Sequence, residues 1–296
     1  MTYDNMLDLI GNTPLVEIHG ITDNPKVKLF AKIEGQNPGG SVKDRAAFGM
    51  IEGAMKKGEI KEGSHVVEAT SGNTGIALAM IAQQFKIKMT LVMPDHATQE
   101  RIDTMRAFGA EVILTPSAKT IEYSREFAQK MVDEKGYFML NQFGNIDNWR
   151  SHFKGTGPEI WKATGGRVTH FVSAMGTTGT IMGVSRYLKA KDSDIQIIGV
   201  QPSEGSRIPG IRRWSPEFLP AIFDKHRVDR TMDVSRDEAI SSMLELVKKH
   251  AIFSGLSAGG AFTVAKKVVA EIEEGTVVFI CPDRGDRYLS SGVFGR

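Results

Sequence analysis

The sequence predicts an α/β protein built from two three-layer domains with parallel-rich sheets. The chain has 296 residues, which is long for one hydrophobic core and suits two domains. A short apolar strand, a turn rich in Gly, Ser and Thr, and an amphipathic helix recur along it. Strands that alternate with helices in this way form parallel sheets with helices on both faces.

The strand candidates are short apolar runs that end at turn residues, at 15–18, 28–33, 65–69, 89–93, 111–114, 138–141, 168–174, 196–201, 252–254 and 276–280. The helix candidates are longer amphipathic runs, at 46–57, 76–85, 99–108, 120–134, from about 180 to 189, 236–250 and 261–273. The helix at 236–250 follows Ser235 and carries Glu238 at the spacing of a capping box.

The boundary between the two domains is expected near residues 145–152. The segment 143–150 is rich in turn residues and precedes a second series of strand and helix candidates. From the pattern alone, the first thirty or so residues could join either domain.

The composition is that of a soluble globular protein, with 41% apolar and 24% charged residues. The net charge of +2 gives no reason to expect nucleic acid or a membrane surface as a partner. No run of about 18 apolar residues and no leader-like N-terminus is present, so we expect neither a membrane-spanning helix nor a signal peptide. With Cys281 as its single cysteine, the chain is expected to be cytoplasmic and without intrachain disulfides.

Lys43 lies in a tight turn, NPGGSVKDR at 37–45, just before an expected helix. Such a turn brings the backbone close to a ligand, and a partly desolvated lysine amine condenses readily with a carbonyl group. Most lysines near turns are solvated surface charges, so this motif alone is weak evidence.

Three further loops between strand and helix are rich in Gly, Ser and Thr: TSGNTG at 70–75, GTTGT at 176–180 and GLSAGG at 255–260. The unpaired N–H groups and the positive dipole end of the following helix favour anions there, although the same residue types also serve as plain N-caps. The two common nucleotide fingerprints do not occur, and the scattered histidines suggest no metal site. A lysine in a turn, a phosphate loop and a second anion loop together suggest pyridoxal phosphate acting on an amino acid.

These four motifs resemble, in the same order, those of the cysteine synthases (O-acetylserine sulfhydrylases), of the β-family or fold type II of pyridoxal-phosphate enzymes. The resemblance runs from GNTPL at 11–15 to RYLS at 287–290, and IPGIRRW at 208–214 and DRGDRY at 283–288 resemble the B-type members. It implies a cofactor in the cleft between two domains. Residues 36–146 would form a smaller, mobile domain, and 1–35 with 147–296 a larger domain that binds the cofactor phosphate.

The resemblance also implies roles for individual residues. Lys43 would be the catalytic residue, binding the cofactor covalently and moving the proton at Cα. Asn73 would hydrogen-bond the ring oxygen of the cofactor, and Ser257 would face its pyridine nitrogen. The phosphate would be held by Gly176, Thr177, Thr178, Gly179 and Thr180. The substrate carboxylate would be bound by Thr70, Ser71, Thr74 and Gln142. An anionic second substrate would be bound by Arg212 and Arg213, which could otherwise be a solvated pair.

The implied reaction is β-replacement on O-acetyl-L-serine. Acetate would leave to give an aminoacrylate, and sulfide or thiosulfate would add to give L-cysteine or S-sulfocysteine. The alternatives are O-phosphoserine or serine as the substrate of a related cysteine or cystathionine synthase, and a non-catalytic relative that has kept the fold. Because members of the family are usually homodimers, we expect a homodimer here.

Overall fold

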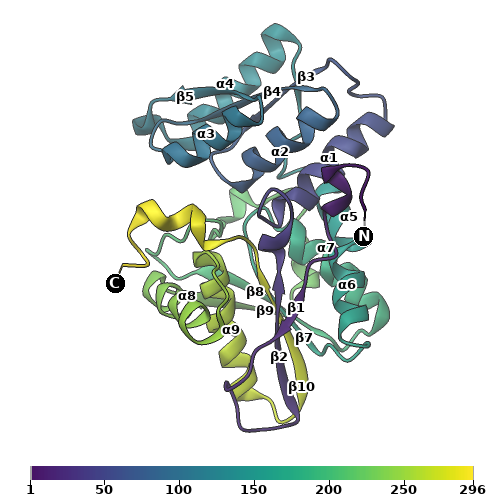
Figure 1. The fold of residues 1–296 in the computed structure, drawn as a ribbon, viewed down its shortest axis with the longest axis vertical. Coiled ribbons are helices and arrows are strands. Elements are labelled where there is room, and N and C mark those ends of the chain that lie inside the picture. Colours follow the sequence, from purple (N-terminus) through teal and green to yellow (C-terminus); the bar gives the residue numbers. More distant parts are fainter. Residues whose placement is uncertain (1, 296) are drawn as a thin grey trace.

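The computed structural model describes residues 2–295 and contains two separate β-sheets, one above the other in Figure 1. The six-stranded sheet has the order β1-β2-β10-β7-β8-β9, and the four-stranded sheet has the order β5-β4-β3-β6. Every neighbouring pair is parallel except β1 and β2, which are antiparallel. The expected fold class is confirmed.

The strands of the larger sheet are β1 (Leu15–Glu17), β2 (Val27–Ile33), β7 (His170–Ala174), β8 (Gln196–Pro202), β9 (Arg230–Val234) and β10 (Gly275–Cys281). Those of the smaller sheet are β3 (His65–Ala69), β4 (Lys88–Pro94), β5 (Glu111–Thr115) and β6 (Phe138–Met139). The α-helices are α1 (Lys43–Lys56), α2 (Asn73–Gln84), α3 (Gln99–Ala107), α4 (Thr120–Lys135), α5 (Ile146–Lys154), α6 (Thr156–Ala163), α7 (Gly179–Lys191), α8 (Arg236–His250) and α9 (Leu256–Glu271). Short 3-10 helices are η1 (Met6–Leu9), η2 (Glu34–Gln36), η3 (Ser117–Lys119), η4 (Pro216–Phe218), η5 (Lys225–Arg227) and η6 (Gly285–Ser291).

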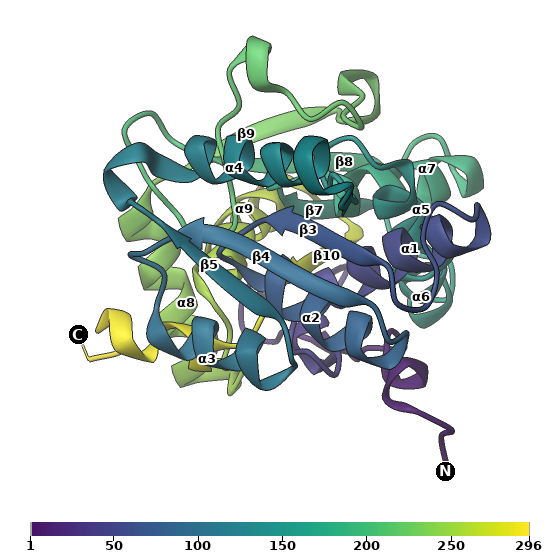
Figure 2. The same ribbon diagram turned by 90° about the horizontal axis from the view of Figure 1, so that it is seen from above.

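Each sheet is covered by helices on both faces, as Figure 2 shows for the smaller one. On that sheet α1, α2 and α3 share one apolar core with β3 and β4, whereas α4 packs Ala128 and Met131 against the other face. On the larger sheet α8 and α9 cover one face, and α6 and α7 cover the opposite face. Both domains are therefore three-layered, because apolar side chains leave both faces of each parallel sheet to be buried.

The structure differs from the predicted elements in several places. Residues 146–163 contain two helices, α5 and α6, that were not predicted; residues 143–150 were expected to be a turn-rich segment, but the Asn145 side chain caps α5 by accepting from the Asp147 N–H. Strand β9 was missed because it is an edge strand with four of its five residues outside the core. Residues 252–254 are not a strand: Ser254 makes only an isolated bridge to Arg284. Helix α1 begins at Lys43 itself and not at residue 46.

The smaller sheet lies entirely within residues 36–146, and all six strands of the larger sheet lie outside this range. The strands thus divide along the chain as the proposed domains do. Among the described residues, no helix is both long and apolar enough to cross a membrane.

Candidate active site

A cavity of about 280 Å³ lies between the two sheets, at the carboxyl ends of their strands. Loops that follow β3, β6, β7, β8 and β10 all contribute to its wall. In open α/β sheets this edge is the usual place for a ligand, because the loops there are free to vary while the strands hold them in place. The sequence motifs far apart in the chain therefore meet at one place.

Lys43 lies in this cavity, at the first position of α1. The preceding turn is held by Gly40, whose φ of +83° favours glycine, and by the Val42 N–H, which donates to the Pro282 carbonyl at 2.7 Å. Burial lowers the pKa of the Lys43 ammonium, and the nearby charge of Asp283 only partly opposes this effect. A lowered pKa increases the fraction of neutral, nucleophilic amine at neutral pH.

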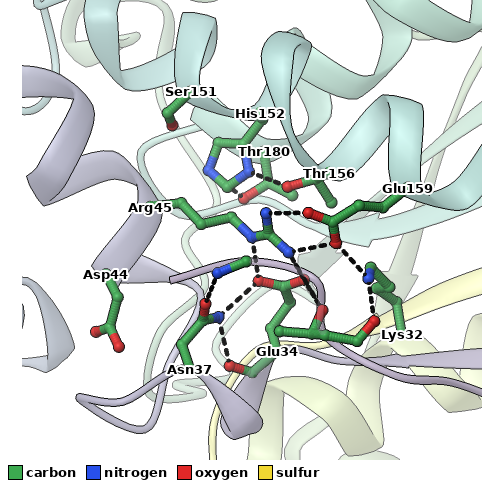
Figure 3. A network of polar contacts seen from close by, with 12 residues as sticks. Lys32, Glu34, Asn37, Asp44, Arg45, Ser151, His152, Thr156, Glu159 and Thr180 are labelled. Carbon is green, nitrogen blue, oxygen red and sulfur yellow. Dashed lines mark hydrogen bonds and ion pairs between the residues drawn. The ribbon is translucent and has the colours of Figure 1, made fainter. Parts of the chain in front are cut away.

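A buried ionic network around Arg45 anchors α1 two residues after Lys43 (Figure 3). The Arg45 guanidinium donates to Glu34 at 2.7 and 2.9 Å and to Glu159 at 2.7 Å through two nitrogens. Lys32 completes the network with an ion pair of 2.6 Å to Glu159. Although burial by itself would raise it, the Arg45 charge lowers the pKa of Glu34 to about 2. The network therefore holds two positive and two negative charges, which is the balance that buried ions require.

The loop at 70–75 leads from β3 into α2 and lines the cavity with Thr70, Ser71, Asn73 and Thr74. The Thr74 hydroxyl donates to the Gln142 side-chain oxygen at 2.8 Å, so the four residues predicted to bind a carboxylate lie together. The first N–H groups of α2 face the same space and favour an anion. Asn73 donates to Asp283 at 2.7 Å, which fixes its amide at the cavity wall.

The loop at 176–180 leads from β7 into α7, and four of its residues line the cavity or the narrow recess beside it. Thr178 adopts a φ of +71° as the N-cap of α7, and its buried hydroxyl oxygen has no hydrogen-bond partner among the described residues. Such an unpaired buried group is costly unless a ligand satisfies it. Gly179 lines neither space; it lies against the Asn148 side chain and can offer only its backbone N–H. The recess is lined by Lys43, Gly176, Thr177, Thr178, Thr180 and Ser257, among others.

Ser257 lies in the first turn of α9 and borders both the cavity and the recess. It is 3% exposed and lies opposite Gly210, so its hydroxyl reaches the same space as the Lys43 amine. Asp283 is the carboxylate near this space, but it lines neither the cavity nor the recess, and one of its oxygens accepts from Asn73 and from the Tyr288 hydroxyl. A neutral hydroxyl is therefore the group that Ser257 offers to a bound ring nitrogen.

The structure separates the two arginines that the sequence placed together. Arg212 lines the cavity. Arg213 does not: its guanidinium pairs with Asp233 and donates to the Pro202 carbonyl, because consecutive residues of an extended loop point in opposite directions. Of the two residues predicted to bind an anionic substrate, the structure therefore places Arg212 at the cavity and Arg213 away from it.

Sequence reasoning missed two further arginines that line the cavity, Arg101 of α3 and Arg125 of α4. Arg125 lies over the Phe143 ring, with 4.5 Å from its guanidinium carbon to the ring centroid. No aspartate or glutamate of the described residues lines this cavity. On the helices α3 and α4 these arginines look like ordinary exposed cations, so no local signal distinguished them.

The residues present fit pyridoxal phosphate. The recess has an unpaired Thr178 hydroxyl and a helix N-terminus for the phosphate, and Lys43 and Ser257 border both that recess and the main cavity. Among the described residues no group of His, Cys, Asp and Glu could hold a metal ion. The polar groups thus match an organic phosphate better than a metal centre.

Comparison with known proteins agrees with this geometry. A family model described as pyridoxal-phosphate dependent enzyme matches residues 6–283. Cysteine synthase B of Pseudomonas aeruginosa is 51% identical over 99% of this chain and 98% of its own, and that of Escherichia coli is 51% identical over 97% and 94%. The crystal structure of a cysteine synthase from Entamoeba histolytica superposes with a TM-score of 0.95 at 39% identity, covering 100% of this chain and 92% of that one.

The chain belongs to the pyridoxal-phosphate dependent enzymes of fold type II, and within them to the cysteine synthases. The similarity to the relatives named cysteine synthase B extends over nearly the whole chain.

Proposed function

We propose that this cysteine synthase forms L-cysteine from O-acetyl-L-serine and that it accepts thiosulfate as well as sulfide as the sulfur donor. The observation that carries the proposal is the meeting of Lys43, the carboxylate-binding loop at 70–75 and the loop at 176–180 around one cavity. The similarity to enzymes named cysteine synthase B supports the choice of reaction. Bound pyridoxal phosphate supplies a carbonyl carbon for the amines of Lys43 and substrate and a ring that stabilises negative charge at Cα.

Lys43 provides the proton transfer at the substrate's Cα. Burial lowers the pKa of its ammonium, which raises the fraction of neutral amine that can accept that proton, and the ammonium so formed can later return it as a general acid. Ser257 would offer a neutral hydroxyl to the bound ring, which would then stabilise less negative charge than it would with an ionised partner. If the ring stabilises less negative charge at Cα, prompt loss of acetate from Cβ is favoured over slower side reactions at Cα.

The substrate carboxylate is bound by Thr70, Ser71, Thr74 and Gln142, together with the N–H groups at the start of α2. The Thr70 and Ser71 hydroxyls and the Gln142 amide N–H donate hydrogen bonds, the Thr74 hydroxyl orients that amide by donating to its oxygen, and the helix dipole adds a favourable field. Binding the carboxylate at one end and the cofactor at the other sets the Cα–H bond beside the Lys43 amine. This positioning removes most of the rotational freedom that would slow the proton transfer.

Arg212, with Arg101 and Arg125, supports thiosulfate as a second donor. Three guanidinium groups around a cavity without carboxylates attract an anion of two negative charges more than hydrosulfide, which carries one. Desolvation lowers the pKa of the Arg212 guanidinium, an effect that Glu122 opposes and Arg125 adds to, so an anion between the two arginines relieves their repulsion.

The test is cysteine and S-sulfocysteine formation by the wild type, Arg212→Gln and Arg213→Gln. For Arg212→Gln we expect kcat/KM to fall about tenfold with thiosulfate and to change less than about twofold with sulfide, since one charge-assisted hydrogen bond corresponds to roughly 1.4 kcal/mol. Arg213→Gln is the matched control and leaves both rates unchanged, because Arg213 faces Asp233. Equal losses with both donors would refute the anion role of Arg212, and no product from O-acetyl-L-serine would refute the reaction.

The assembly and location of the enzyme belong to the same proposal. We infer a homodimer located in the cytoplasm, supported by the family to which the chain belongs and by its single buried thiol, Cys281. Analytical ultracentrifugation at micromolar concentration tests the first inference, and cell fractionation tests the second. A monomer at that concentration would contradict the dimer.

A further inference from the structure

Asn148 of α5 contacts both loops that bind the reactants. Its side-chain amide donates to the Gln142 backbone carbonyl at 2.7 Å and to the Thr177 hydroxyl at 3.3 Å. Asn148 is 1% exposed and lines neither the cavity nor the recess, so it acts on the ligands only through neighbouring residues, by hydrogen bonds to Gln142 and Thr177 and by packing against Gly179.

These contacts belong to a continuous chain of hydrogen bonds. Thr74 donates to the Gln142 side chain at 2.8 Å, and the backbone of the same Gln142 accepts from Asn148, which reaches Thr177. The four residues are each less than 9% exposed. Because water is excluded, each hydrogen bond is stronger than at the surface, and losing one leaves a buried group unsatisfied.

The geometry also sets the direction of one hydroxyl. Since the Thr177 oxygen accepts from the Asn148 amide, its own hydrogen is free to point at an acceptor in the recess. A phosphate has acceptors only, so a threonine held in this way is prepared to donate to it.

Helix α5 holds Asn148 in place. Gly179 and Gly183 of α7 allow α5 to lie directly against α7, since a side chain at either glycine would overlap Asn148 or the Trp149 carbonyl. Asp147 ties the other side of α5 to α1 through Lys57, at 2.6 Å. The helix therefore has little freedom to move relative to either loop.

We propose that Asn148 is a positioning residue that couples the substrate-carboxylate loop to the phosphate loop, so that occupation of either strengthens binding at the other. The inference rests on the proposed function, because it takes Gln142 and Thr177 as ligand-binding residues. A carboxylate that orders Gln142 also orders Asn148 and hence Thr177, and the linkage acts equally in the opposite direction.

The experiment measures the dissociation constant of pyridoxal 5′-phosphate from the enzyme by equilibrium dialysis, with saturating propionate and with equimolar chloride. Propionate has a carboxylate but no amine, so it cannot compete with Lys43 for the cofactor carbonyl. In the wild type we expect propionate to tighten cofactor binding about fivefold, the lower end of typical coupling between sites. In Asn148→Ala we expect the dissociation constants in chloride and in propionate to be equal, which is a ratio of about one.

Ser151→Ala is the matched control. Its hydroxyl donates to the Asn148 backbone carbonyl at 2.7 Å on the same helix and contacts neither loop, so the wild-type ratio should persist. A purely structural role for Asn148 would weaken cofactor binding in both buffers and leave the ratio unchanged, which would overturn the proposal. If the alanine variant does not fold, Asn148→Ser, whose side chain is too short to span both loops, gives the same readout.

The outcomes separate this inference from the proposed function. A wild-type ratio of one with tight cofactor binding refutes the coupling alone. Failure to bind pyridoxal 5′-phosphate in either buffer refutes the proposed function and the coupling together. The ³¹P resonance of the bound cofactor adds a second readout: it should shift in Asn148→Ala, where the Thr177 hydroxyl is no longer oriented, and stay unchanged in Ser151→Ala.

Discussion

Lys43 combines two requirements that conflict at the surface of a protein: an ammonium that releases its proton more readily than usual and a side chain that is held in place. Its enclosure in the cavity lowers the ammonium pKa, and its position at the start of α1 fixes its backbone. Both properties arise from the turn at 37–45, where Gly40 and the contact between Val42 and Pro282 bring the chain against β10.

The first prediction concerns this amine. Replacing Lys43 by Ala should lower the rate of cysteine formation by at least about a thousandfold, because the proton at Cα then has no positioned base. The measurement is the rate with O-acetyl-L-serine and sulfide, alongside circular dichroism to show that the fold is kept. A variant that retains a tenth of the wild-type rate would contradict the role of Lys43.

Asp44, beside Lys43, gives a prediction about pH. Burial raises the pKa of its carboxyl to about 7, although the Gly39 N–H and the charge of Arg287 oppose the shift. The unfolded chain releases this proton near pH 4, so between about pH 4 and pH 7 only the folded state keeps it. The free energy of unfolding therefore falls as pH rises through this window. Above about pH 7 the folded state carries the full free-energy cost of burying the ionised Asp44 carboxylate.

Asp44→Asn should remove this cost. The variant should be more stable than the wild type at pH 8, by up to about 4 kcal/mol, and should have no such advantage at pH 4. The asparagine amide would replace an oxygen that has no partner among the described residues, while its own oxygen still accepts from Gly39. Urea unfolding of both proteins from pH 4 to 8 measures the difference; a constant difference across that range would contradict the raised pKa.

At the scale of elements, the sequence predicted the strand–loop–helix units well and the helix pair α5–α6 poorly. The loops at 70–75, 176–180 and 255–260 have local signals, since Gly, Ser and Thr are required where a strand turns into a helix. The buried residues of helix α5 are polar and include Asn148 and His152, which are 1% and 2% exposed, whereas its apolar Ile146 and Phe153 are exposed. From the sequence alone, such a buried polar face looks like a turn. The hydrogen-bonding partners that explain it, on α7 and in the phosphate loop, are distant along the chain.

Helix α1 owes its position to the Arg45 network, which joins it to β2, η2 and α6. Arg45→Lys should lower the free energy of unfolding by about 3 kcal/mol, because an ammonium cannot make the paired hydrogen bonds to Glu34 and Glu159 and leaves buried charge incompletely matched. Chemical denaturation measures this loss. The matched control is Arg230→Lys, whose pair with Glu271 is half exposed and should cost less than about 1 kcal/mol.

At the scale of the whole molecule, the site belongs to neither sheet alone. Thr70–Thr74, Arg101 and Arg125 come from the part that contains the smaller sheet, and the phosphate loop and Arg212 from the part that contains the larger one. Resemblance predicted a site shared between two parts of the chain and nearly half of the residues in the cavity wall. It missed Arg101 and Arg125 because their importance comes from where α3 and α4 place them, which only the tertiary structure shows.

The division of the wall between two parts suggests that the substrate carboxylate draws the smaller domain, residues 36–146, toward the larger one. Closure excludes water from the cavity, which protects a reactive intermediate state from hydrolysis. Cysteines placed at Lys130 and Lys249, both well exposed, allow donor and acceptor dyes on the two domains. The native Cys281 is buried and burial raises the pKa of its thiol, so it should not react with the dyes.

With O-acetyl-L-serine and no sulfur donor, the distance from resonance energy transfer should shorten by more than about 2 Å, the scale of domain rearrangements on binding. A second labelled pair, at Lys56 and Lys130, lies within the smaller domain and should show no change. Thr74→Val, which loses the hydroxyl that donates to Gln142, should reduce the shortening because the Gln142 amide is then no longer held in position to bind the carboxylate. An equal change in both labelled pairs would mean that the smaller domain deforms internally, and the hinge between the domains would be refuted.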